Sequence, residues 1–366
     1  MSNKTFKISD GPSLSVTNKH WKKAVLIKNK SLDDVVKNLN STGLKIALIV
    51  DLKGKFVGTI TDGDIRRGLL KGFNLKDKIY SIINYKPIFV ASLNDKKAAL
   101  ALMKDNYVEH IPVINSTGKI TGLFILSGFV ASTKRNKSNI KVVIMSGGYG
   151  KRLLPLTKNK PKPLIEIQGK PMLEQLILRI KKFGFYEFIL SINYLGEMIQ
   201  KYFKSGKILD VNISYIKENK PLGTAGSLHK LKNIKNQDIL VTNCDVFSDI
   251  DYTSVVEYHK SNFADATMVV RHYEIPNPFD VVETVGKKFV SFETKPSKYE
   301  NINAGIYVLN AKVLKYLEKD KKIDMPFFFK KLSEKKLNVL VYPIFENWED
   351  LGNLNNIKNQ NKKKFN

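Results

Sequence analysis

The chain has 366 residues, of which 43% are apolar, and it carries 61 Lys and Arg against 34 Asp and Glu. This length is typical of two domains, and the apolar fraction excludes wholesale disorder. The sequence contains no uninterrupted apolar stretch long enough for a membrane helix and no apolar N-terminal leader. We therefore expect a cytoplasmic protein with no membrane partner, and the single cysteine, Cys244, excludes internal disulfides.

The formal net charge is +27, which raises the question of a nucleic-acid partner. The lysines are spread along the whole chain instead of gathering in one segment. We therefore predict solvated basic faces and no nucleic acid. A positive field of this kind would still attract phosphorylated small molecules.

Residues 24–129 contain two related halves offset by about 64 positions, in which Gly54 matches Gly118 and Gly58 matches Gly122. Each half predicts a helix, a strand, a turn and a second strand. This internal repeat indicates two copies of one α+β unit.

The residues Gly58–Arg66 (GTITDGDIR) and His110–Ile114 (HIPVI) resemble a tandem pair of CBS domains. The resemblance implies that Thr61 and Asp64 bond the ribose of an adenine nucleotide, and a carboxylate can accept from two vicinal hydroxyls. A structural or dimerising role is the alternative, since many such pairs associate, and we expect a homo-oligomer.

The second copy departs from this pattern. Ile125 and Gly128 stand where the first copy has the threonine and the aspartate. We therefore expect no ribose site there.

An apolar run, Val142–Met145, predicts a buried parallel strand that ends in the turn Ser146–Gly150. Glycines allow the backbone of such a turn to approach a ligand closely, and its N–H groups can hold an anion. The cations Arg152 and Lys162 follow. We interpret this stretch as a polyphosphate site; the alternative is an ordinary turn before a basic surface.

Helical and strand patterns then alternate along the second half. We predict a helix at Met172–Phe183 and strands at Phe188–Ile192, Val211–Ile216 and Ile239–Thr242. This alternation predicts an α/β fold, a doubly wound, mainly parallel, Rossmann-like sheet. Ligands of such sheets bind at the carboxyl ends of the strands.

Five motifs in order resemble the sugar-1-phosphate nucleotidyltransferases: the stretch Gly147–Met172, then Glu218–Gly226, Asn243–Val246, the region Pro278–Tyr307, and Trp348–Gly352. The resemblance implies transfer of a nucleotidyl group from a nucleoside triphosphate to a sugar-1-phosphate. It also implies Mg²⁺ as cofactor, which suits carboxylate and phosphate oxygens.

The resemblance carries roles onto individual residues. It implies that Arg152, Lys162, Asp245 and Asp350 are catalytic, with the two aspartates as metal ligands. The implied nucleotide-binding residues are Met145, Ser146, Gly147, Gly148, Gly150, Glu218, Gly223, Thr224 and Ala225. The implied sugar-phosphate ligands are Glu283, Lys295 and Asn303.

Glu218 stands at the position that faces the base in this family. A carboxylate only accepts hydrogen bonds, which matches the N1–H and amino donors of guanine. We therefore favour GTP; a uridylyl or thymidylyl enzyme, and a mere surface charge at Glu218, are the alternatives.

Two departures lie near the expected sugar site, because Asp280 replaces a glycine and Thr294 replaces a glutamate. Fusion to a CBS pair resembles the glucosamine-1-phosphate guanylyltransferases of legionaminic acid synthesis. Mannose-1-phosphate or heptose-1-phosphate guanylyltransferases are the alternatives. A nucleotide sensor with an inactive transferase domain is the alternative from another class.

The predicted organisation has five parts. These are an N-terminal extension (1–20), the CBS pair (21–130), a linker (131–139), the catalytic domain (140–353) and a basic tail (354–366).

Overall fold

A computed structural model describes residues 13–16, 20–106, 108–127, 138–234 and 237–362. The chain divides into two compact units, Met1–Asn136 and Lys137–Asn366. No helix within the described ranges is long and apolar enough to cross a membrane.

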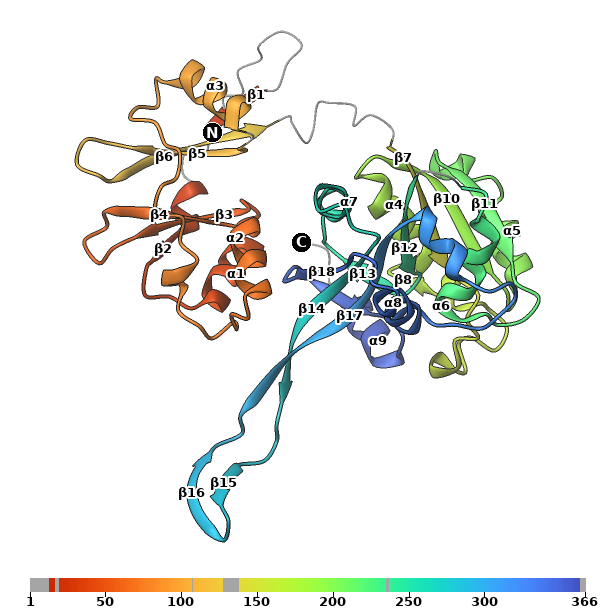
Figure 1. The fold of residues 1–366 in the computed structure, drawn as a ribbon. Coiled ribbons are helices and arrows are strands. Elements are labelled where there is room, and N and C mark those ends of the chain that lie inside the picture. Colours follow the sequence, from red (N-terminus) through yellow and green to blue (C-terminus); the bar gives the residue numbers. More distant parts are fainter. Residues whose placement is uncertain (1–12, 17–19, 107, 128–137, 235–236, 363–366) are drawn as a thin grey trace. The chain divides into compact units, whose positions relative to one another are not determined.

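The first unit contains the predicted repeat (Figure 1). Helix α1 begins at Leu32 and α3 begins 64 positions later, at Lys96. Strand β3 begins at Ile46 and β5 begins 64 positions later, at His110. The described elements are β1 (Ser13–Val16), β2 (Val25–Ile27), α1 (Leu32–Thr42), β3 (Ile46–Val50), β4 (Phe56–Thr61), α2 (Asp62–Leu70), α3 (Lys96–Asn106), β5 (His110–Ile114) and β6 (Ile120–Ser127).

The two halves form separate small sheets, ordered β2-β3-β4 and β1-β6-β5. Leu123 of the second half packs with Ile46 and Leu48 of the first, so one apolar cluster joins the two halves, and the second half has a further cluster of its own. Strand β1 belongs to the predicted N-terminal extension but pairs with β6. The rest of that extension before residue 20, at 1–12 and 17–19, lies outside the described residues.

The second unit is built on a seven-stranded sheet ordered β11-β10-β7-β12-β17-β14-β18. Its ladders are parallel between β11 and β10, β10 and β7, β7 and β12, and β14 and β18, and antiparallel on both sides of β17. The predicted α/β, mainly parallel fold is confirmed. The strands are β7 (Ser138–Met145), β8 (Glu166–Ile167), β9 (Lys170–Pro171), β10 (Phe185–Ile192), β11 (Asn212–Lys217), β12 (Asp238–Asn243), β13 (Val246–Ser248), β14 (Ala266–Pro276), β15 (Val281–Val285), β16 (Lys288–Glu293), β17 (Ser297–Asn310), β18 (Val339–Ile344) and β19 (Trp348–Asp350).

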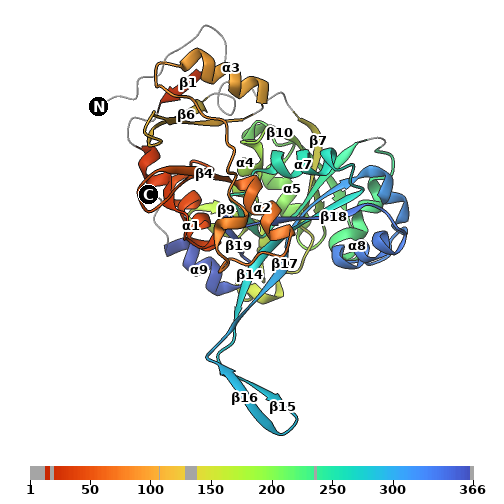
Figure 2. The ribbon, with the colours of Figure 1, turned by 60° about the vertical axis from the view of Figure 1, so that its left-hand side comes forward.

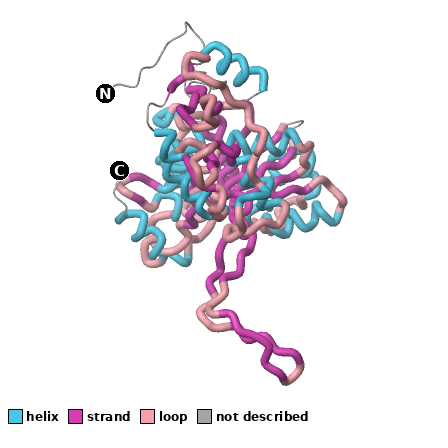
Figure 3. The backbone as a smooth tube through the Cα atoms, turned by 90° about the vertical axis from the view of Figure 1, so that its left-hand side faces the viewer, coloured by secondary structure: helices cyan, strands magenta, loops and turns pink. Residues whose placement is uncertain are grey.

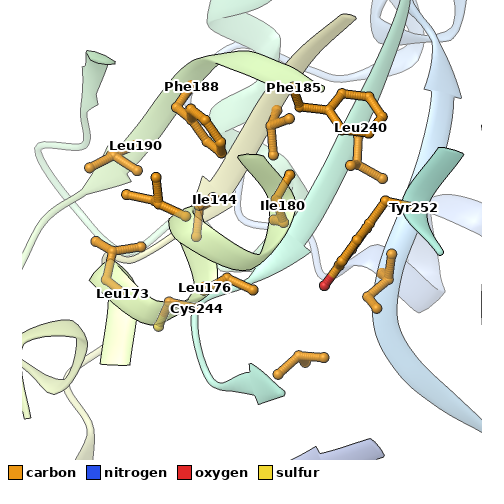
Figure 4. Packing of buried hydrophobic residues seen from close by; sticks show 14 of the residues in the cluster. Ile144, Leu173, Leu176, Ile180, Phe185, Phe188, Leu190, Leu240, Cys244 and Tyr252 are labelled. Atoms are coloured by element: carbon orange, nitrogen blue, oxygen red, sulfur yellow. The ribbon is translucent and has the colours of Figure 1, made fainter. Parts of the chain in front are cut away.

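Helices cover both faces of this sheet, since alternate residues of one strand point to opposite sides. Val142 and Ile144 of β7 pack with α4, α5 and α7, whereas Val143 and Met145 pack with α8. Figure 4 shows the first of these layers, where Leu173, Leu176 and Ile180 of α4 lie against the strands. The helices are α4 (Met172–Lys181), α5 (Gly196–Phe203), α6 (Gly223–Gly226), α7 (Tyr252–Ser261), α8 (Met325–Glu334) and α9 (Leu354–Lys362).

The ends of the second unit differ from the prediction. Residues 354–362 are not a tail but form α9, because Ile357 is buried in a cluster that Leu354 also contacts. The predicted linker is shorter than expected, since 138–139 already belong to β7; its remaining residues, 131–137, and residues 363–366 of the tail lie outside the described ranges.

Strands β14 and β17 continue beyond the sheet as a two-stranded ribbon with the hairpin β15–β16 at its tip. This ribbon runs away from the sheet in three views of the molecule (Figures 1, 2 and 3). We refer to residues 277–296, which lie between the last pair of the β14–β17 ladder, as the arm.

Candidate active site

The glycine-rich loop follows the buried end of β7, and its glycines have different neighbours. A Cβ on Gly147 would lie 3.2 Å from Glu218 Oε1, and a Cβ on Gly150 would lie 2.9 Å from Thr157 Cγ2. Gly150 also has φ +63°, a conformation that disfavours other residues. A Cβ on Gly148 would meet no atom within 4 Å. The loop is therefore packed at both ends and open at Gly148, where a ligand can approach.

The start and end of this loop are held by hydrogen bonds. Ser146 is buried, and its N–H donates to Ser191 O at 2.8 Å. The Thr157 hydroxyl donates to Gly150 O at 2.9 Å. These bonds fix the loop before any ligand binds.

Lys162 and Arg152 lie near two carboxylates. Lys162 begins a short 3₁₀ turn after Pro161, and its Nζ forms an ion pair with Asp245 Oδ2. Arg152 lies in the 3₁₀ turn Lys151–Leu153 and is exposed. Both cations act to lower the pKa of Asp350, so all four charges belong to one electrostatic site.

Asp245 and Asp350 are brought together by strand pairing. Asp245 follows β12, and β13 then pairs with β19 so that Val246 lies opposite Asp350. Leu351 N–H donates to Asp245 O at 2.9 Å, so the backbones next to the two aspartates are bonded to each other. Burial, and then repulsion from Asp245, raise the pKa of Asp350 above its usual range, although the N–H of Gly352 opposes this.

This pair of carboxylates fits a hard divalent cation. Mg²⁺ is commonly held by one or two carboxylates together with substrate phosphates and water, because it demands octahedral oxygen ligands. The described part of the chain contains no cluster of three or more His, Cys, Asp or Glu suited to a metal. A pair of carboxylates suits an ion that also takes substrate oxygens.

Cys244 lies beside Asp245 but is not suited to act as a nucleophile. It is packed in the core between the sheet and α4 (Figure 4). Burial, and then the charge of Asp245, raise the pKa of its thiol to about 12. The thiolate is therefore scarce near neutral pH.

Glu218 is buried, so the alternative that it is a surface charge is wrong. The Ser191 hydroxyl donates to Glu218 Oε1 at 2.7 Å, and the Leu222 N–H donates to Oε2 at 2.9 Å. Two carboxylate oxygens have about four acceptor positions, so these two bonds hold the side chain and leave capacity for further donors.

The segment that follows, Gly223–Ala225, packs against the residues before α8. A Cβ on Gly223 would lie 2.6 Å from Ile323 O, and Thr224 N–H donates to Asp324 Oδ1 at 3.0 Å. Ala225 is buried in the core. The close packing on this side explains the glycine, and contact of this segment with a base stays a prediction.

Two of the three residues expected at the sugar, Glu283 and Lys295, do not lie with the carboxylates. Glu283 and Lys295 are exposed on the arm, where Glu283 accepts from the Ser291 hydroxyl at 2.7 Å. Asn303 lies within the sheet on β17, opposite Val270 of β14, and its amide donates to Tyr307 Oη at 2.7 Å. The separation arises because β14 and β17 pair with each other beyond the point where other strands accompany them.

Asp280, which replaces the expected glycine, has a local role. It accepts from the Lys295 N–H at 3.2 Å and so joins the two strands at the base of the hairpin. Thr294 and Glu293 lie on the same exposed segment.

In the first unit, Thr61 and Asp64 bond each other at the start of α2. Asp64 Oδ2 accepts from the N–H and the hydroxyl of Thr61, at 2.8 Å and 2.7 Å, and Oδ1 accepts from Arg67 at 2.6 Å. This is a capping box, which stabilises a helix start. The expected ribose contact stays a prediction, and it would have to compete with these bonds.

Sequence reasoning missed the polar residues that support Glu218. Ser191 is fully buried within β10, where the strand pattern otherwise predicts apolar side chains, and Asn193 donates to Glu218 O at 2.6 Å. A serine inside an apolar strand is the signal that could have indicated a polar neighbour at this edge.

Comparisons with protein families and with individual proteins both relate the second unit to nucleotidyl transferases. The model of the nucleotidyl transferase family matches residues 141–365, and a CBS domain model matches residues 25–71, the first half of the predicted pair. The chain is 37% identical over 223 residues to the probable mannose-1-phosphate guanylyltransferase 2 of Oryza sativa subsp. japonica. It is 36% identical over 226 residues to mannose-1-phosphate guanylyltransferase 1 of Arabidopsis thaliana. Each alignment covers 58% of this chain and 61% of the relative, so the chain spans about three fifths of these proteins.

The solved structures of similar fold include a provisionally assigned glucose-1-phosphate thymidylyltransferase of Bacillus anthracis, with a TM-score of 0.51 and 21% identity, covering 62% of this chain and 97% of that one. This likeness supports the α/β architecture of the second unit.

Proposed function

The chain belongs to the nucleotidyl transferase family, and we propose that it transfers a guanylyl group from GTP to a sugar-1-phosphate, releasing pyrophosphate. The observation that carries this proposal is the assembly of Arg152, Lys162, Asp245 and Asp350 beside the open loop at Gly148. A sugar phosphate oxygen attacking the α-phosphorus needs alignment and charge neutralisation more than covalent help.

Each charged group has a proposed task. Arg152 and the loop N–H groups bind the leaving pyrophosphate, and Lys162 neutralises the α-phosphate and the incoming phosphate. Asp245 and Asp350 would hold a divalent cation, for which we propose Mg²⁺; when bound, it neutralises phosphate charge as a Lewis acid. The ion pair between Lys162 and Asp245 keeps both side chains oriented toward this point.

Guanine is the proposed base. The buried carboxylate of Glu218 lies beside the loop, since a Cβ on Gly147 would come within 3.2 Å of its Oε1, and it can accept from both guanine donors. The names of the plant relatives, which are mannose-1-phosphate guanylyltransferases, support the same base.

The sugar acceptor has two candidates. Glucosamine-1-phosphate, the acceptor of the legionaminic acid enzymes, follows from the CBS domain ahead of the catalytic unit. Mannose-1-phosphate follows from the names of the relatives. We also propose that adenine nucleotides bind the first CBS half and regulate turnover.

Pyrophosphate release tests these proposals directly. Purified protein is incubated with Mg²⁺, one of GTP, UTP or dTTP, and one of glucosamine-, mannose- or heptose-1-phosphate. We expect release with GTP and a single preferred sugar, and none when the cation is chelated. No release with any pair would contradict the transferase proposal and favour the sensor with an inactive transferase domain; repeating the assay with AMP or ATP tests regulation.

A further inference from the structure

The arm leaves the sheet because its flanking strands lose their outer neighbours. Strand β18 accompanies β14 only as far as Arg271, and β12 accompanies β17 only as far as Ile306. The pairing of β14 with β17 continues to Pro276 and Ser297. A two-stranded ribbon by itself is marginally stable in water and has two unpaired edges. Contact with another protein surface would therefore stabilise this ribbon.

The arm also exposes large apolar side chains. Phe279, Phe289 and Phe292 are 74%, 64% and 63% exposed. Phe292 lies opposite Val282 across the hairpin, while the neighbouring pair on the other face is Glu283 with Ser291. One face at this point is therefore apolar and the other carries a carboxylate. Clustered exposed apolar groups mark an interaction surface.

The charge of the arm indicates what covers it. Its acidic residues are Asp280, Glu283 and Glu293, and its basic residues are Lys287, Lys288 and Lys295, so its formal charge is zero. The whole chain carries +27. A neutral apolar segment is the part of such a chain that can meet a second, equally basic copy without repulsion.

The loop of the second unit that carries Arg152 also exposes apolar side chains. Tyr149, Leu154 and Leu156 are 46%, 52% and 47% exposed, and they flank Arg152 in the sequence. An apolar arm seated there would lie next to the phosphate-binding loop. It would also cover side chains that are otherwise left in water.

We propose that the arm of one copy lies against the loop at Tyr149–Leu156 of a second copy and supplies Glu283 and Lys295 to that copy's sugar-phosphate site. Exchange of identical arms gives a closed, two-fold dimer in which each site is made of two chains. This inference rests on the proposed transferase function only for the role of the two polar residues; the docking itself does not depend on it.

The competing arrangement is an arm that folds back over its own body. The two strands at its base are joined to each other, since Lys295 N–H donates to Asp280 and Asn277 N–H donates to Pro296 O at 3.1 Å. The arm therefore leaves the sheet as one paired ribbon, and it runs away from its own body in all three views (Figures 1, 2 and 3).

Complementation between two defective chains separates the two arrangements. Asp245→Asn removes a metal ligand from the body, and the double change Glu283→Gln with Lys295→Ala removes the polar groups of the arm. The two chains are co-expressed with different tags and isolated through both tags. Such a dimer has one intact site if the arm acts on the other copy, so at a sugar concentration below the wild-type KM we expect about half of the wild-type turnover. Turnover no higher than that of the two variants alone would overturn the proposal.

Crosslinking tests the docking without any activity. Phe289 is replaced by photoreactive benzoylphenylalanine in a mixture of ¹⁴N- and ¹⁵N-labelled full-length protein, with Phe263, which is 87% exposed on the body, as the control position. We expect mixed-isotope crosslinks from position 289 to peptides around 149–156 and none to that segment from 263. Crosslinks only between like isotopes, or none to this segment, would overturn the proposal even if the protein released no pyrophosphate.

Discussion

The side chains of Lys162 and Asp245 are 11% and 15% exposed, whereas every residue of β15 and β16 is exposed. The first pair is held by the sheet, by the β13–β19 pairing and by a packed loop. Among the described residues, Glu283 and Lys295 bond only within their own hairpin. The proposed nucleotide half of the site is therefore preorganised within one chain, while the position of the proposed sugar half depends on what the arm contacts.

The largest effect should come from the preorganised half. Asp245→Asn should lower cation-dependent turnover roughly 1,000-fold, because a carboxylate ligand contributes several kcal/mol of transition-state charge stabilisation. Initial rates of pyrophosphate release measure this. The matched control is Asp249→Asn, a nearby aspartate that pairs with Arg179 at the surface; equal losses in both variants would contradict the metal assignment.

Base selection should depend on Glu218. Glu218→Gln should reduce the preference for GTP over UTP roughly 10- to 100-fold, since a two-bond contact to a base contributes about 1–3 kcal/mol of discrimination. The measurement is the ratio of kcat/KM for the two nucleotides. An unchanged ratio with a lower melting temperature would show that Glu218 serves only to bind Ser191 and Leu222.

The arm should affect the sugar and not the nucleotide. Lys295→Ala should raise KM for the sugar-1-phosphate roughly tenfold, as loss of a charged hydrogen bond costs about 1.5–3 kcal/mol, and should leave KM for GTP unchanged. Lys288→Ala, another basic residue of the arm, is the control. A similar rise in KM for GTP would mean that the two halves are not separate.

Substitutions at two loop glycines should separate a role in packing from a role in ligand binding. Gly150→Ala should destabilise the fold by about 1–2 kcal/mol, because its φ is left-handed and a Cβ would crowd Thr157. Gly148→Ala should leave the melting temperature unchanged and weaken GTP binding. Thermal unfolding and nucleotide titration of both variants check this, and a destabilised Gly148→Ala would contradict the open loop.

Alkylation of Cys244 should have the smallest effect on turnover, because this thiol is buried. Its thiol has a pKa of about 12, so iodoacetamide at pH 8 should leave turnover unchanged until the protein unfolds. Because the unfolded thiol ionises near its usual pKa and the folded one does not, stability should fall as pH rises from about 9 toward 12. Rapid inactivation of the native protein by the reagent would contradict this burial.

Much of this organisation could be predicted from local patterns. The apolar run before Ser146 predicts β7, the glycines predict the loop, and the 64-residue repeat predicts α1 and α3. Helix α9 was missed because its apolar positions, Leu354 and Ile357, are few among polar residues. Its burial depends on the cluster it meets, which no local pattern contains.

The sequence by itself determined the α/β class and the glycine-rich loop, because these depend on short-range periodicity and backbone freedom, whereas the resemblance to a family pointed to Asp245 and Asp350. Only the tertiary structure decided that Asp350 lies beside Asp245, that Ser191 supports a buried Glu218, and that Glu283 and Lys295 lie on a projecting arm. Each of these depends on pairing or packing between segments far apart in the chain. The length of a strand can be read locally, but the point at which its neighbours stop pairing with it cannot.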